Sequence, residues 1–502
     1  MSYLIKILLQ TILVLFTLSL CYSCTGLKAT HNTFEAAQRP TTDGIWTELN
    51  FKHNRSFFMP LDNHFDSLKW RLRALESAES SIDIQIFLWK KDHSGKLIMS
   101  EILAAADRGV KVRLLIDDTF TIQQDQILTN INHHPNINIR IYNPFKRRYN
   151  SFSMRFLMNV TEFSRIDHRM HNKVLIVDNH VTIMGGRNLG DEYFGLHPDA
   201  NFRDMDLLAN GNITPFISTI FDIYWANPWS FPVEKILRKR PKDIEIKTRP
   251  RTLFFPLNEN HQQRITAWKR FKEQATEAEY SVLYDLPLEA NPKNRTDDNF
   301  TLDIYKLISD AKSSVDIISP YFIPTPELEE AIFNAEQRGV EVRILTNSLQ
   351  SNNHTIAHSF YRKHMEKYVD SGAELHEYRA WARDRNLFMY PPSENKTLGL
   401  HAKIILIDDD LSLIGSANLD PRSLNINSEL GILLKSEKLC AQLRKLLEVD
   451  FHPRNSWKVE YNQEGNILWR GDDKTLHKQP RNSRLQLFEA WFLGLLPVES
   501  KI

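Results

Sequence analysis

The chain has 502 residues, of which 42% are hydrophobic and 25% are charged. These fractions are typical of folded globular proteins and exclude a disordered or fibrous chain, while the length is too great for a single hydrophobic core. Lys and Arg total 63 against 62 Asp and Glu, which argues mildly against a dedicated nucleic-acid binder, because such proteins usually carry a clear basic excess. Three cysteines are too few to build a disulfide framework or a cysteine metal site.

The N-terminal segment has the features of an export signal. A basic residue precedes an apolar stretch from Ile7 to Leu20, which is short for a membrane span of about 20 residues. Ser23 directly precedes Cys24, as in the cleavage box of bacterial lipoproteins, in which the cysteine is lipidated. We predict a signal or lipoprotein-like segment over residues 1–24, with a plain secreted protein and a retained anchor as alternatives. All three place the protein in the bacterial cell envelope, and lipidation would hold it at a membrane, facing the periplasm.

A long internal duplication follows. Two similar segments, at residues 80–84 and 313–317, each begin a β-branched run that is typical of a buried strand. A helical pattern comes next and ends at an Arg-Gly-Val sequence, at 108–110 and 338–340, beyond which a second apolar strand begins. Each half therefore predicts a β-α-β unit, and the Arg-Gly-Val sequences lie 230 residues apart.

Polar residues recur downstream at the same 230-residue offset. His171-x-Lys173 and His401-x-Lys403 each precede a short apolar strand. Because residues i and i+2 of a strand point the same way, each half presents an imidazole beside an ammonium. A single histidine at a strand start is usually structural, but folding gives no reason to place the same polar group before two apolar strands. The duplication therefore indicates a functional site.

Further residues complete each copy of the motif. Asn188 and Asn418 follow Gly-Gly or Gly-Ser pairs, which allow the backbone to approach a ligand, and their amides can donate to an anionic oxygen. Two lysines and two asparagines that converge on one phosphodiester would stabilise its developing charge without a metal ion or cofactor, while two histidines supply a nucleophile and an acid. Asp178 and Asp408 belong to the repeated catalytic motif, although an aspartate that opens a turn favours a structural role.

The repeated spacing resembles the paired signature of the phospholipase D superfamily, in the form His-x-Lys, four residues, Asp, six residues, Gly-[Gly/Ser]-x-Asn. The resemblance covers most of the chain and implies the α/β fold class, with two similar phospholipase D-like α/β/α sandwich domains related by pseudo-twofold symmetry around one shared active site. We expect these domains at residues 25–245 and 246–502, separated by a connection rich in Arg, Lys and Pro. The resemblance also implies a phosphohistidine intermediate, with His171 as the nucleophile and His401 as the acid.

The superfamily uses an acidic residue after the asparagine to hold the other ring nitrogen of each histidine. By position this role matches Glu429 in the second half and Asp206 in the first. Asp204 is a competitor in the first half, because residues 190–203 form an extra segment before the acid.

Other segments are similar to the cardiolipin synthase branch of this superfamily, especially its bacterial C-type enzymes. They are residues 185–194, 319–324, 345–349, 420–423 and 495–500. The resemblance implies a phosphatidyltransferase that makes cardiolipin from phosphatidylglycerol and a second phospholipid, either phosphatidylethanolamine or phosphatidylglycerol. The expected partners are phospholipid substrates and a membrane, with no nucleic acid.

Three alternatives remain open at this point. If water resolves the intermediate, the enzyme is a hydrolytic phospholipase D, and the catalytic residues do not distinguish the two outcomes. A secreted phosphodiesterase or nuclease of the same superfamily would need a basic, aromatic-lined groove, which the neutral composition does not favour. A non-catalytic membrane scaffold with a decayed site is opposed by the two intact motifs.

Two apolar regions are candidates for contact with a lipid surface. Residues 487–496 carry apolar and aromatic side chains at helical spacing, and residues 156–158 follow the basic cluster at 146–148. We hypothesise that one of these regions docks on lipid, although such stripes are more often part of a core.

Overall fold

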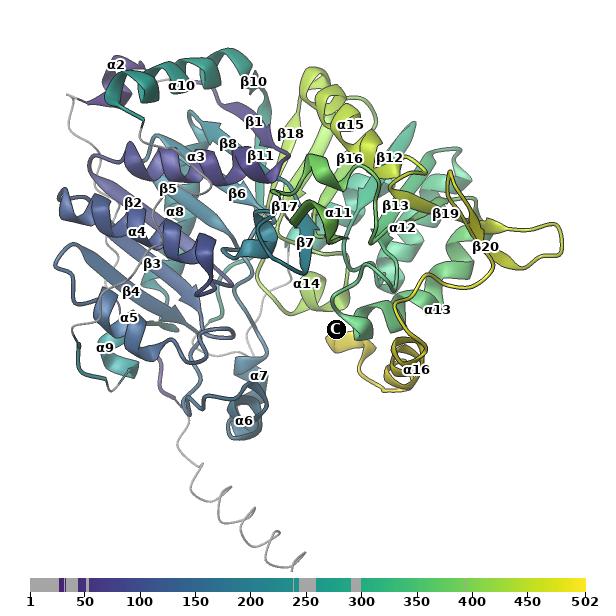
Figure 1. Ribbon diagram of the computed structural model, residues 1–502, viewed down its shortest axis with the longest axis horizontal. Coiled ribbons are helices and arrows are strands. Elements are labelled where there is room, and N and C mark those ends of the chain that lie inside the picture. Colours follow the sequence, from purple (N-terminus) through teal and green to yellow (C-terminus); the bar gives the residue numbers. More distant parts are fainter. Residues whose placement is uncertain are drawn as a thin grey trace, which may run out of the picture.

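Two mixed β-sheets organise the chain, one in each half (Figure 1). The computed structural model describes residues 27–30, 32, 44–50, 54–237, 239–242, 259–289, 299–391 and 393–502. The predicted signal segment 1–24, including Cys24, lies outside the described residues. In the part of the chain that the structure describes, no helix is both long and apolar enough to cross a membrane.

The first sheet has the strand order β10-β1-β8-β6-β5-β2-β3-β4-β9. Strands β2, β3 and β4 are parallel, whereas β5 pairs with β2 in the antiparallel direction. The strands are β1 (Phe57–Leu61), β2 (Ser81–Ile86), β3 (Lys111–Asp117), β4 (Ile137–Tyr142), β5 (Val174–Val177), β6 (Val181–Gly185), β8 (Asp206–Asn210), β9 (Ser230–Pro232) and β10 (Thr276–Glu277).

The second sheet has the order β11-β18-β17-β16-β12-β13-β14-β19-β20-β21. Its strands β12, β13 and β14 are parallel, and β16 pairs with β12 in the antiparallel direction. The strands are β11 (Glu279–Tyr284), β12 (Ser314–Ile318), β13 (Glu341–Asn347), β14 (Glu374–Tyr378), β16 (Ile404–Ile407), β17 (Leu411–Gly415), β18 (Leu430–Lys435), β19 (Ser456–Tyr461), β20 (Ile467–Arg470) and β21 (Thr475–Leu476).

The two sheets repeat one arrangement, as the duplicated sequence predicts. The series β8-β6-β5-β2-β3-β4 in the first sheet corresponds to β18-β17-β16-β12-β13-β14 in the second. The two β-α-β units are β2–α4–β3 and β12–α12–β13, and their strands pair in parallel. This equivalence gives the molecule its pseudo-twofold relation.

Helices cover both faces of the sheets. The main ones are α3 (His64–Glu76), α4 (His93–Asp107), α5 (Asp125–Ile131), α8 (Ile213–Ala226), α10 (His261–Gln274), α11 (Asn299–Ser309), α12 (Pro326–Gln337), α13 (Thr355–Ser371), α15 (Glu437–Phe451) and α16 (Arg484–Leu493), and the short ones are α2 (Ile45–Glu48), α6 (Phe152–Leu157), α7 (Phe163–Ile166), α9 (Val233–Ile236) and α14 (Pro421–Asn425). Side-chain caps fix several starts; for example, Asp92 accepts a hydrogen bond from the N–H of Gly95 before α4.

Three hydrophobic clusters hold these layers together. One cluster packs α3, α4 and α10 on the outer face of the first sheet, and another packs α11, α12 and α13 on the second sheet. The central cluster includes α8, α15 and the inner faces of both sheets, so the two domains share one core. Strand β5 shows the alternation that this requires, because Leu175 and Val177 belong to the outer cluster whereas Val174 and Ile176 belong to the central one.

The first domain extends beyond the predicted boundary between residues 245 and 246. The ring of Trp268 in α10 lies 5.0 Å from that of Trp70 in α3, and β10 pairs with β1 of the first sheet. The chain enters the second sheet only at β11, which pairs with β18. The predicted boundary is therefore wrong: a charged, proline-containing connection marks a linker, but it does not indicate on which sheet the following helix packs.

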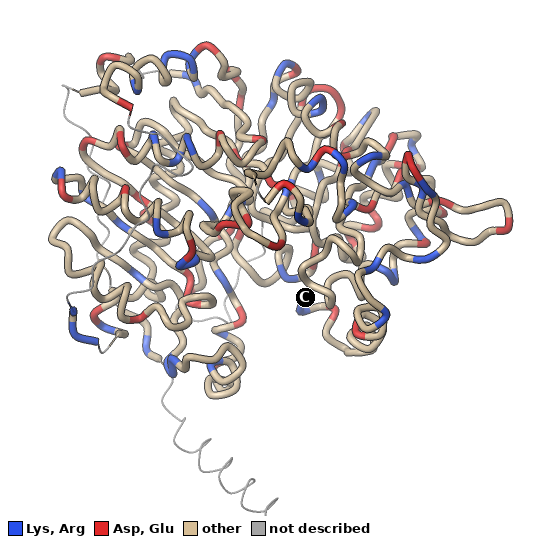
Figure 2. Tube along the Cα trace, in the orientation of Figure 1, with Lys and Arg blue, Asp and Glu red and all other residues tan. Residues whose placement is uncertain are grey.

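Charged residues of both signs are interspersed over the two domains (Figure 2). Several charges lie inside the fold as pairs. Arg113 binds Asp83 at 2.6 Å on the neighbouring strand β2, and Arg343 binds Asp316 at 2.7 Å in the equivalent place of the second domain. The duplication thus extends to a partly buried ion pair, which aligns the two parallel strands of each β-α-β unit.

Replacing Trp268 by alanine tests whether α10 belongs to the first domain. The indole is fully buried between Trp46 and Trp70, so the Trp268→Ala variant should lose about 3–5 kcal/mol of unfolding free energy. Chemical denaturation followed by tryptophan fluorescence measures this loss. A change below about 1 kcal/mol would place α10 outside the first core.

Candidate active site

Short backbone contacts between the domains bring the two repeated motifs together. Strand β7 (Ala200–Arg203) pairs in parallel with β15 (Thr397–Leu400), and the N–H of His401 donates to the carbonyl of Arg203 at 2.7 Å. At the corresponding place of the other motif, the N–H of His171 donates to the carbonyl of Ser428 at 2.9 Å. Each histidine therefore lies beside the segment that carries the other domain's acid.

The acids cross between the domains. Both carboxylate oxygens of Glu429 lie 2.9 Å from Nδ1 of His171, and Oδ2 of Asp204 lies 2.6 Å from Nδ1 of His401. Both histidines and both acids are buried. Neither half alone contains a complete histidine–acid pair, so the single site depends on both domains.

Asp206 does not hold a histidine, contrary to the sequence prediction. Its carboxylate binds Arg71 at 2.9 Å and Arg187 at 3.0 Å, and these two arginines neutralise it. Sheet register explains the assignment of the acids: Asp206 pairs with Gly185, as Gly431 pairs with Gly415 in the second sheet. The residue two positions earlier is Asp204 in the first domain and Glu429 in the second, so the competing candidate takes the role.

The Gly-Gly and Gly-Ser pairs make room for these acids. A Cβ on Gly186 would lie 2.2 Å from Oδ1 of Asp204, so only glycine fits beside this carboxylate. At the equivalent position Ser416 donates from Oγ to Glu429 at 2.5 Å. Gly185 has a φ of +152°, and a Cβ there would lie 2.6 Å from the backbone of the next strand. The expected close approach therefore occurs between strands of the protein rather than toward a ligand.

Each motif lysine lies against its own histidine. Nζ of Lys173 donates to the carbonyl of His171 at 2.5 Å, and Nζ of Lys403 lies 2.9 Å from Nδ1 of His401. Burial lowers the pKa of Lys173 to about 7 and that of Lys403 to about 8. An anion that enters the site would favour the charged form of both amines.

The two histidines differ in their electrostatic surroundings. Burial, aided by nearby lysines and opposed by Glu429, lowers the pKa of His171 to about 4. Burial also lowers the pKa of His401 well below its usual value, and both Lys403 and Lys173 add to the shift. Burial opposes ionisation of Glu429, but the charges of His171 and Lys173 outweigh it and lower the pKa of this acid.

Aromatic rings and the two asparagines complete the lining. The ring of Phe87 lies edge-on to His171 at 4.8 Å, and that of Tyr193 lies edge-on to His401 at 5.1 Å. Nδ2 of Asn188 donates to the hydroxyl of Tyr193 at 3.0 Å. Within the described residues, Oδ1 of Asn188 and Oδ1 of Asn418 are buried without a hydrogen-bond partner, so each amide oxygen can accept from a hydroxyl of a ligand.

Asp178 and Asp408 lie at the far end of their strands from the histidines and serve the fold. The carboxylate of Asp178 accepts hydrogen bonds from three successive N–H groups of residues 79–81. That of Asp408 accepts from residues 312–314 in the same way. Both aspartates have a left-handed φ, of 52° and 51°, at the turn they open. These contacts support the turn interpretation that the sequence favours for both aspartates.

Among the described residues, no group of three or more His, Cys, Asp or Glu side chains has an arrangement that could hold a metal ion. The site chemistry available from the side chains consists of two imidazoles, two amines, two amides and two carboxylates. This set suits attack on an anionic phosphodiester, because the amines offset its charge while the imidazoles supply a nucleophile and a proton.

The chain is similar to several known proteins. A family model described as "Cardiolipin synthase, PLD-like domain" matches residues 72–217 and 304–451. Cardiolipin synthase C of Escherichia coli (strain K12) is 32% identical over 88% of this chain and 95% of its own length. Cardiolipin synthase A of Pseudomonas putida is 26% identical over 79% of this chain and 68% of its own length. The crystal structure of phosphatidylserine synthase from Haemophilus influenzae Rd KW20 is 16% identical, with a TM-score of 0.52, and the match covers 81% of this chain and 89% of that one. This is a likeness of fold alone.

The fold and the paired motifs define an enzyme of the phospholipase D type, a phosphatidyltransferase. The family model covers more than half of the chain, and the chain belongs to the PLD-like cardiolipin synthase family. The family resemblance in the sequence and the fold class of two similar phospholipase D-like domains are thereby confirmed.

Substitution of the two aspartates should separate the positioning role from the structural one. Asp204→Asn keeps the shape of the side chain but removes the carboxylate that holds His401, so kcat/KM should fall by about 10²–10⁴ with little change in thermal stability. Asp206→Asn leaves Arg71 and Arg187 without their buried counter-charge and should cost about 3–5 kcal/mol of stability. Steady-state kinetics and thermal melts of both variants give the comparison; the reverse pattern would restore Asp206 as the acid.

The pKa shifts predict a pH profile. The lysines must be charged to offset the phosphate, so kcat/KM should decline as the pH rises through 7 to 8, where Lys173 and Lys403 lose their protons. On the acid side, His171 remains neutral and nucleophilic until the pH approaches about 4. Lys173→Arg keeps a positive charge at higher pH and should move the alkaline limb upward. A profile that stays flat from pH 6 to 9 would contradict this assignment.

Proposed function

We propose that this enzyme makes cardiolipin from phosphatidylglycerol and a second phospholipid, either phosphatidylglycerol or phosphatidylethanolamine, through a phosphohistidine intermediate. The observation that carries the proposal is the pair of histidines in one site, each held at Nδ1 by an acid of the other domain. A histidine held in this way offers Nε2 to a substrate, as nucleophile or as acid. The similarity to two cardiolipin synthases supports the choice of product.

The proposed reaction has two steps. First, Nε2 of His171 attacks the phosphorus of the donor lipid, the bond from phosphorus to the headgroup oxygen breaks, and His401 gives its proton to that oxygen. Glycerol or ethanolamine leaves. Second, neutral His401 takes the proton of a hydroxyl on the acceptor phosphatidylglycerol, whose oxygen attacks phosphorus while the bond to His171 breaks. The lysines and the amides of Asn188 and Asn418 stabilise the charge on phosphate in both steps.

The surroundings of the two rings support the choice of nucleophile. Glu429 holds His171 with both oxygens, and its ionised form makes the opposite nitrogen more electron-rich. At His401 the amine of Lys403 lies against Nδ1 and makes the protonated ring a stronger acid. The negative charge of a bound phosphodiester offsets the lysines, so binding favours the protonation that His401 needs.

Limited access of water favours the synthase over hydrolysis. The side chains of His171 and His401 are only 9% and 7% exposed, so a lipid hydroxyl delivered along the protein surface competes with few water molecules. The interspersed charges of Figure 2 do not favour a nuclease, which would require a continuous basic track.

Incubation of the purified protein with phosphatidylglycerol vesicles, with and without phosphatidylethanolamine, tests the reaction. We expect cardiolipin by mass spectrometry, at a rate unchanged by EDTA and at least about 10³-fold lower in His171→Ala. Release of glycerol or of ethanolamine identifies the donor. Phosphatidic acid as the sole product would make the enzyme a hydrolase, and loss of activity on chelation would contradict the metal-free mechanism.

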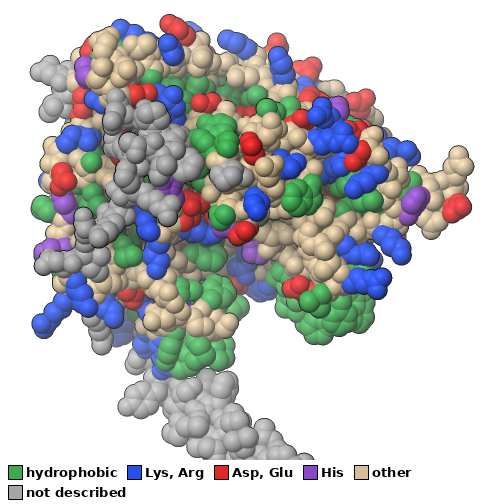
Figure 3. All heavy atoms as spheres, viewed as in Figure 1, with side chains coloured by type: hydrophobic (Ala, Val, Ile, Leu, Met, Phe, Trp, Pro, Cys, Tyr) green, Lys and Arg blue, Asp and Glu red, His purple; other side chains and the backbone are tan. Residues whose placement is uncertain are grey.

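The proposed partner is a membrane of the cell envelope, to which lipidated Cys24 would anchor the chain on the periplasmic side. Figure 3 shows two hydrophobic patches at one end of the molecule, one over α6 and α7 and one over α16. We define them as the α6 patch (Phe152, Met154, Leu157, Val160 and Phe163) and the α16 patch (Leu485, Phe488, Trp491, Phe492 and Leu495), all of which are exposed. The two regions named from the sequence are thus surface rather than core, which is the arrangement that docking on lipid requires.

Single substitutions should weaken membrane binding through these patches. In a Cys24→Ser background, which removes the lipid anchor, Leu157→Ser and Trp491→Ser should each reduce binding to phosphatidylglycerol vesicles about tenfold, because each removes an inserted apolar side chain. Leu302→Ser on α11 is a matched control, since Leu302 is 55% exposed and Leu157 is 54% exposed. Vesicle cosedimentation measures the difference, and equal binding by all variants would contradict docking.

A further inference from the structure

A row of aromatic rings joins the α6 patch to the nucleophile. Phe152 on α6 stacks on Phe120, with ring centres 6.2 Å apart and planes 17° apart. Phe120 meets Phe87 edge-on at 5.3 Å, and Phe87 meets His171 edge-on at 4.8 Å. We call Phe152, Phe120 and Phe87 the aromatic track. It runs from an exposed helix to the ring that reacts.

The outer part of the track faces solvent. Phe152 is 46% exposed and Phe120 is 37% exposed, whereas Phe87 is half-buried next to His171. Exposed phenylalanines at adjoining positions are costly in water and are rare on soluble surfaces unless a ligand or partner covers them. Exposure therefore decreases step by step toward the catalytic ring, as expected of a path that an apolar chain follows inward.

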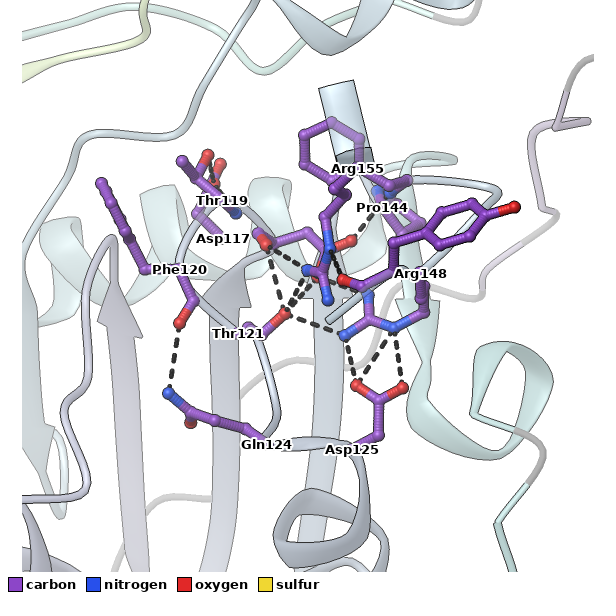
Figure 4. A network of polar contacts seen from close by, with 12 residues as sticks. Asp117, Thr119, Phe120, Thr121, Gln124, Asp125, Pro144, Arg148 and Arg155 are labelled. Atoms are coloured by element: carbon purple, nitrogen blue, oxygen red, sulfur yellow. Dashed lines mark hydrogen bonds and ion pairs between the residues drawn. The ribbon is translucent and has the colours of Figure 1, made fainter. Parts of the chain in front are cut away.

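A buried ion network fixes the geometry of the track (Figure 4). Arg148 and Arg155 both bind Asp118, and Arg148 also binds Asp125 at 2.8 Å. Arg155 comes from α6, the helix of Phe152, while Asp118 belongs to the loop that carries Phe120. Figure 4 shows the Phe120 ring pointing away from this network. The ion pairs thus hold the two outer rings without covering them.

The same loop is tied to the catalytic segment. Asp117, at the end of β3, accepts hydrogen bonds from the N–H of Thr119 at 2.8 Å and from the N–H of Met170 at 3.0 Å. Met170 directly precedes His171. One carboxylate therefore ties the loop that carries Phe120 to the residue before the nucleophile.

Among the described residues of the second domain, the positions that correspond to Phe120 and Phe87 are not aromatic. The equivalent of Phe120, three residues after the end of the third strand, is Gln350, and the equivalent of Phe87, after the second strand, is Pro320. On the other side of the pseudo-twofold axis, the rings of Tyr193 and Phe202 lie 5.1 and 5.3 Å from that of His401. Tyr193 is buried and Phe202 is half-buried, so these rings do not form a path to an exposed patch. An asymmetric apolar path fits an asymmetric task, in which one lipid is bound for attack by His171.

The start of the described chain lies beside the outer end of the track. The N–H of Leu27 donates to Oε2 of Glu162 at 3.2 Å, within the short helix η1 (Val160–Glu162) that follows α6. The segment before Leu27 contains the apolar stretch from Ile7 to Leu20 and Cys24. Whether that segment ends in a lipidated cysteine or in a retained apolar anchor, it joins the protein beside the α6 patch.

We propose that the aromatic track binds an acyl chain of the phosphatidyl donor and guides its phosphate from the membrane to His171. This inference rests on the proposed function, because it identifies the reacting lipid as the one whose phosphorus becomes bound to His171. The acyl chain of the lipid lies across Phe152 and Phe120, and the lipid's glycerol backbone reaches Phe87. The phosphate therefore arrives beside the imidazole of His171. The acyl chains of the donor lipid then contribute to catalysis because they position the phosphate beside His171, and not only because they bind to an apolar surface.

Chain-length dependence tests the track apart from membrane docking. With monomeric phosphatidylglycerols of four- to eight-carbon chains, kcat/KM of the wild type should rise by up to about fourfold per added methylene, the factor equivalent to burial of one CH₂. Phe120→Ser and Phe152→Ser should reduce the slope of this dependence to less than half of the wild-type slope. Phe216→Ser on α8 is the matched control, since Phe216 is 43% exposed and lies off the track. Equal loss at every chain length, or an unchanged slope, would overturn the proposal.

Photocrosslinking separates failure of the track from failure of the proposed reaction. The full-length His171→Ala protein is irradiated with phosphatidylglycerol vesicles that carry a diazirine in one acyl chain, so no turnover is required. Label on peptides that contain Phe120 or Phe152 supports the track even if no cardiolipin forms with the wild type. Label confined to the α16 patch or to other surfaces overturns it, whatever reaction the enzyme catalyses.

Discussion

The crossed pairing of each histidine with the other domain's acid is the constraint on which the rest of the structure depends. A buried imidazole needs a partner at Nδ1 to fix its ring, and here the partner of His171 is Glu429 while that of His401 is Asp204. Neither pair can form within one domain. The shared central core and the pairing of β7 with β15 follow from this requirement, because both keep the two acids within hydrogen-bond distance of the opposite rings.

The duplication makes the two halves of the site similar, but residues at a few equivalent positions differ between the halves. Gly186 leaves space for Asp204, whereas Ser416 at the equivalent place donates a hydrogen bond to Glu429. The first domain also carries Arg187, which needs Asp206 as its counter-charge, while the second has the uncharged pair Ala417 and Gly431. Two nearly equivalent histidines thereby acquire different surroundings, which is the condition for one to act as nucleophile and the other as acid.

The polar site and the apolar surface are parts of one arrangement. The buried network around Asp118 holds α6 against the loop that follows β3, and Asp117 of the same strand end holds the residue before His171. These buried charges would be costly if they were unpaired, and as ion pairs they make the structure rigid at the point where a flexible lipid would enter. The loop that carries Phe120, helix α6 and the segment of His171 are consequently tied together by these buried contacts.

The sequence by itself determined the features that repeat along the chain. The 230-residue offset shows the duplication, the β-α-β units and the four motif residues from His171 to Lys403, because strand and helix periodicities are local and a shared register across them is not accidental. The composition likewise indicated a folded globular protein with nearly balanced charges. Glu429 could be placed by motif alone, since no inserted segment precedes it.

Only the tertiary structure decided which groups meet. The choice of Asp204 over Asp206 depends on the register of β8 against β6, and the domain change after β10 depends on which sheet α10 covers. The structural role of Asp178 and Asp408 depends on the backbone N–H groups that each carboxylate faces. The aromatic track joins rings from three separate segments. Such contacts are long-range, so no local pattern records them, and packing of the two sheets around a common core is what sets them.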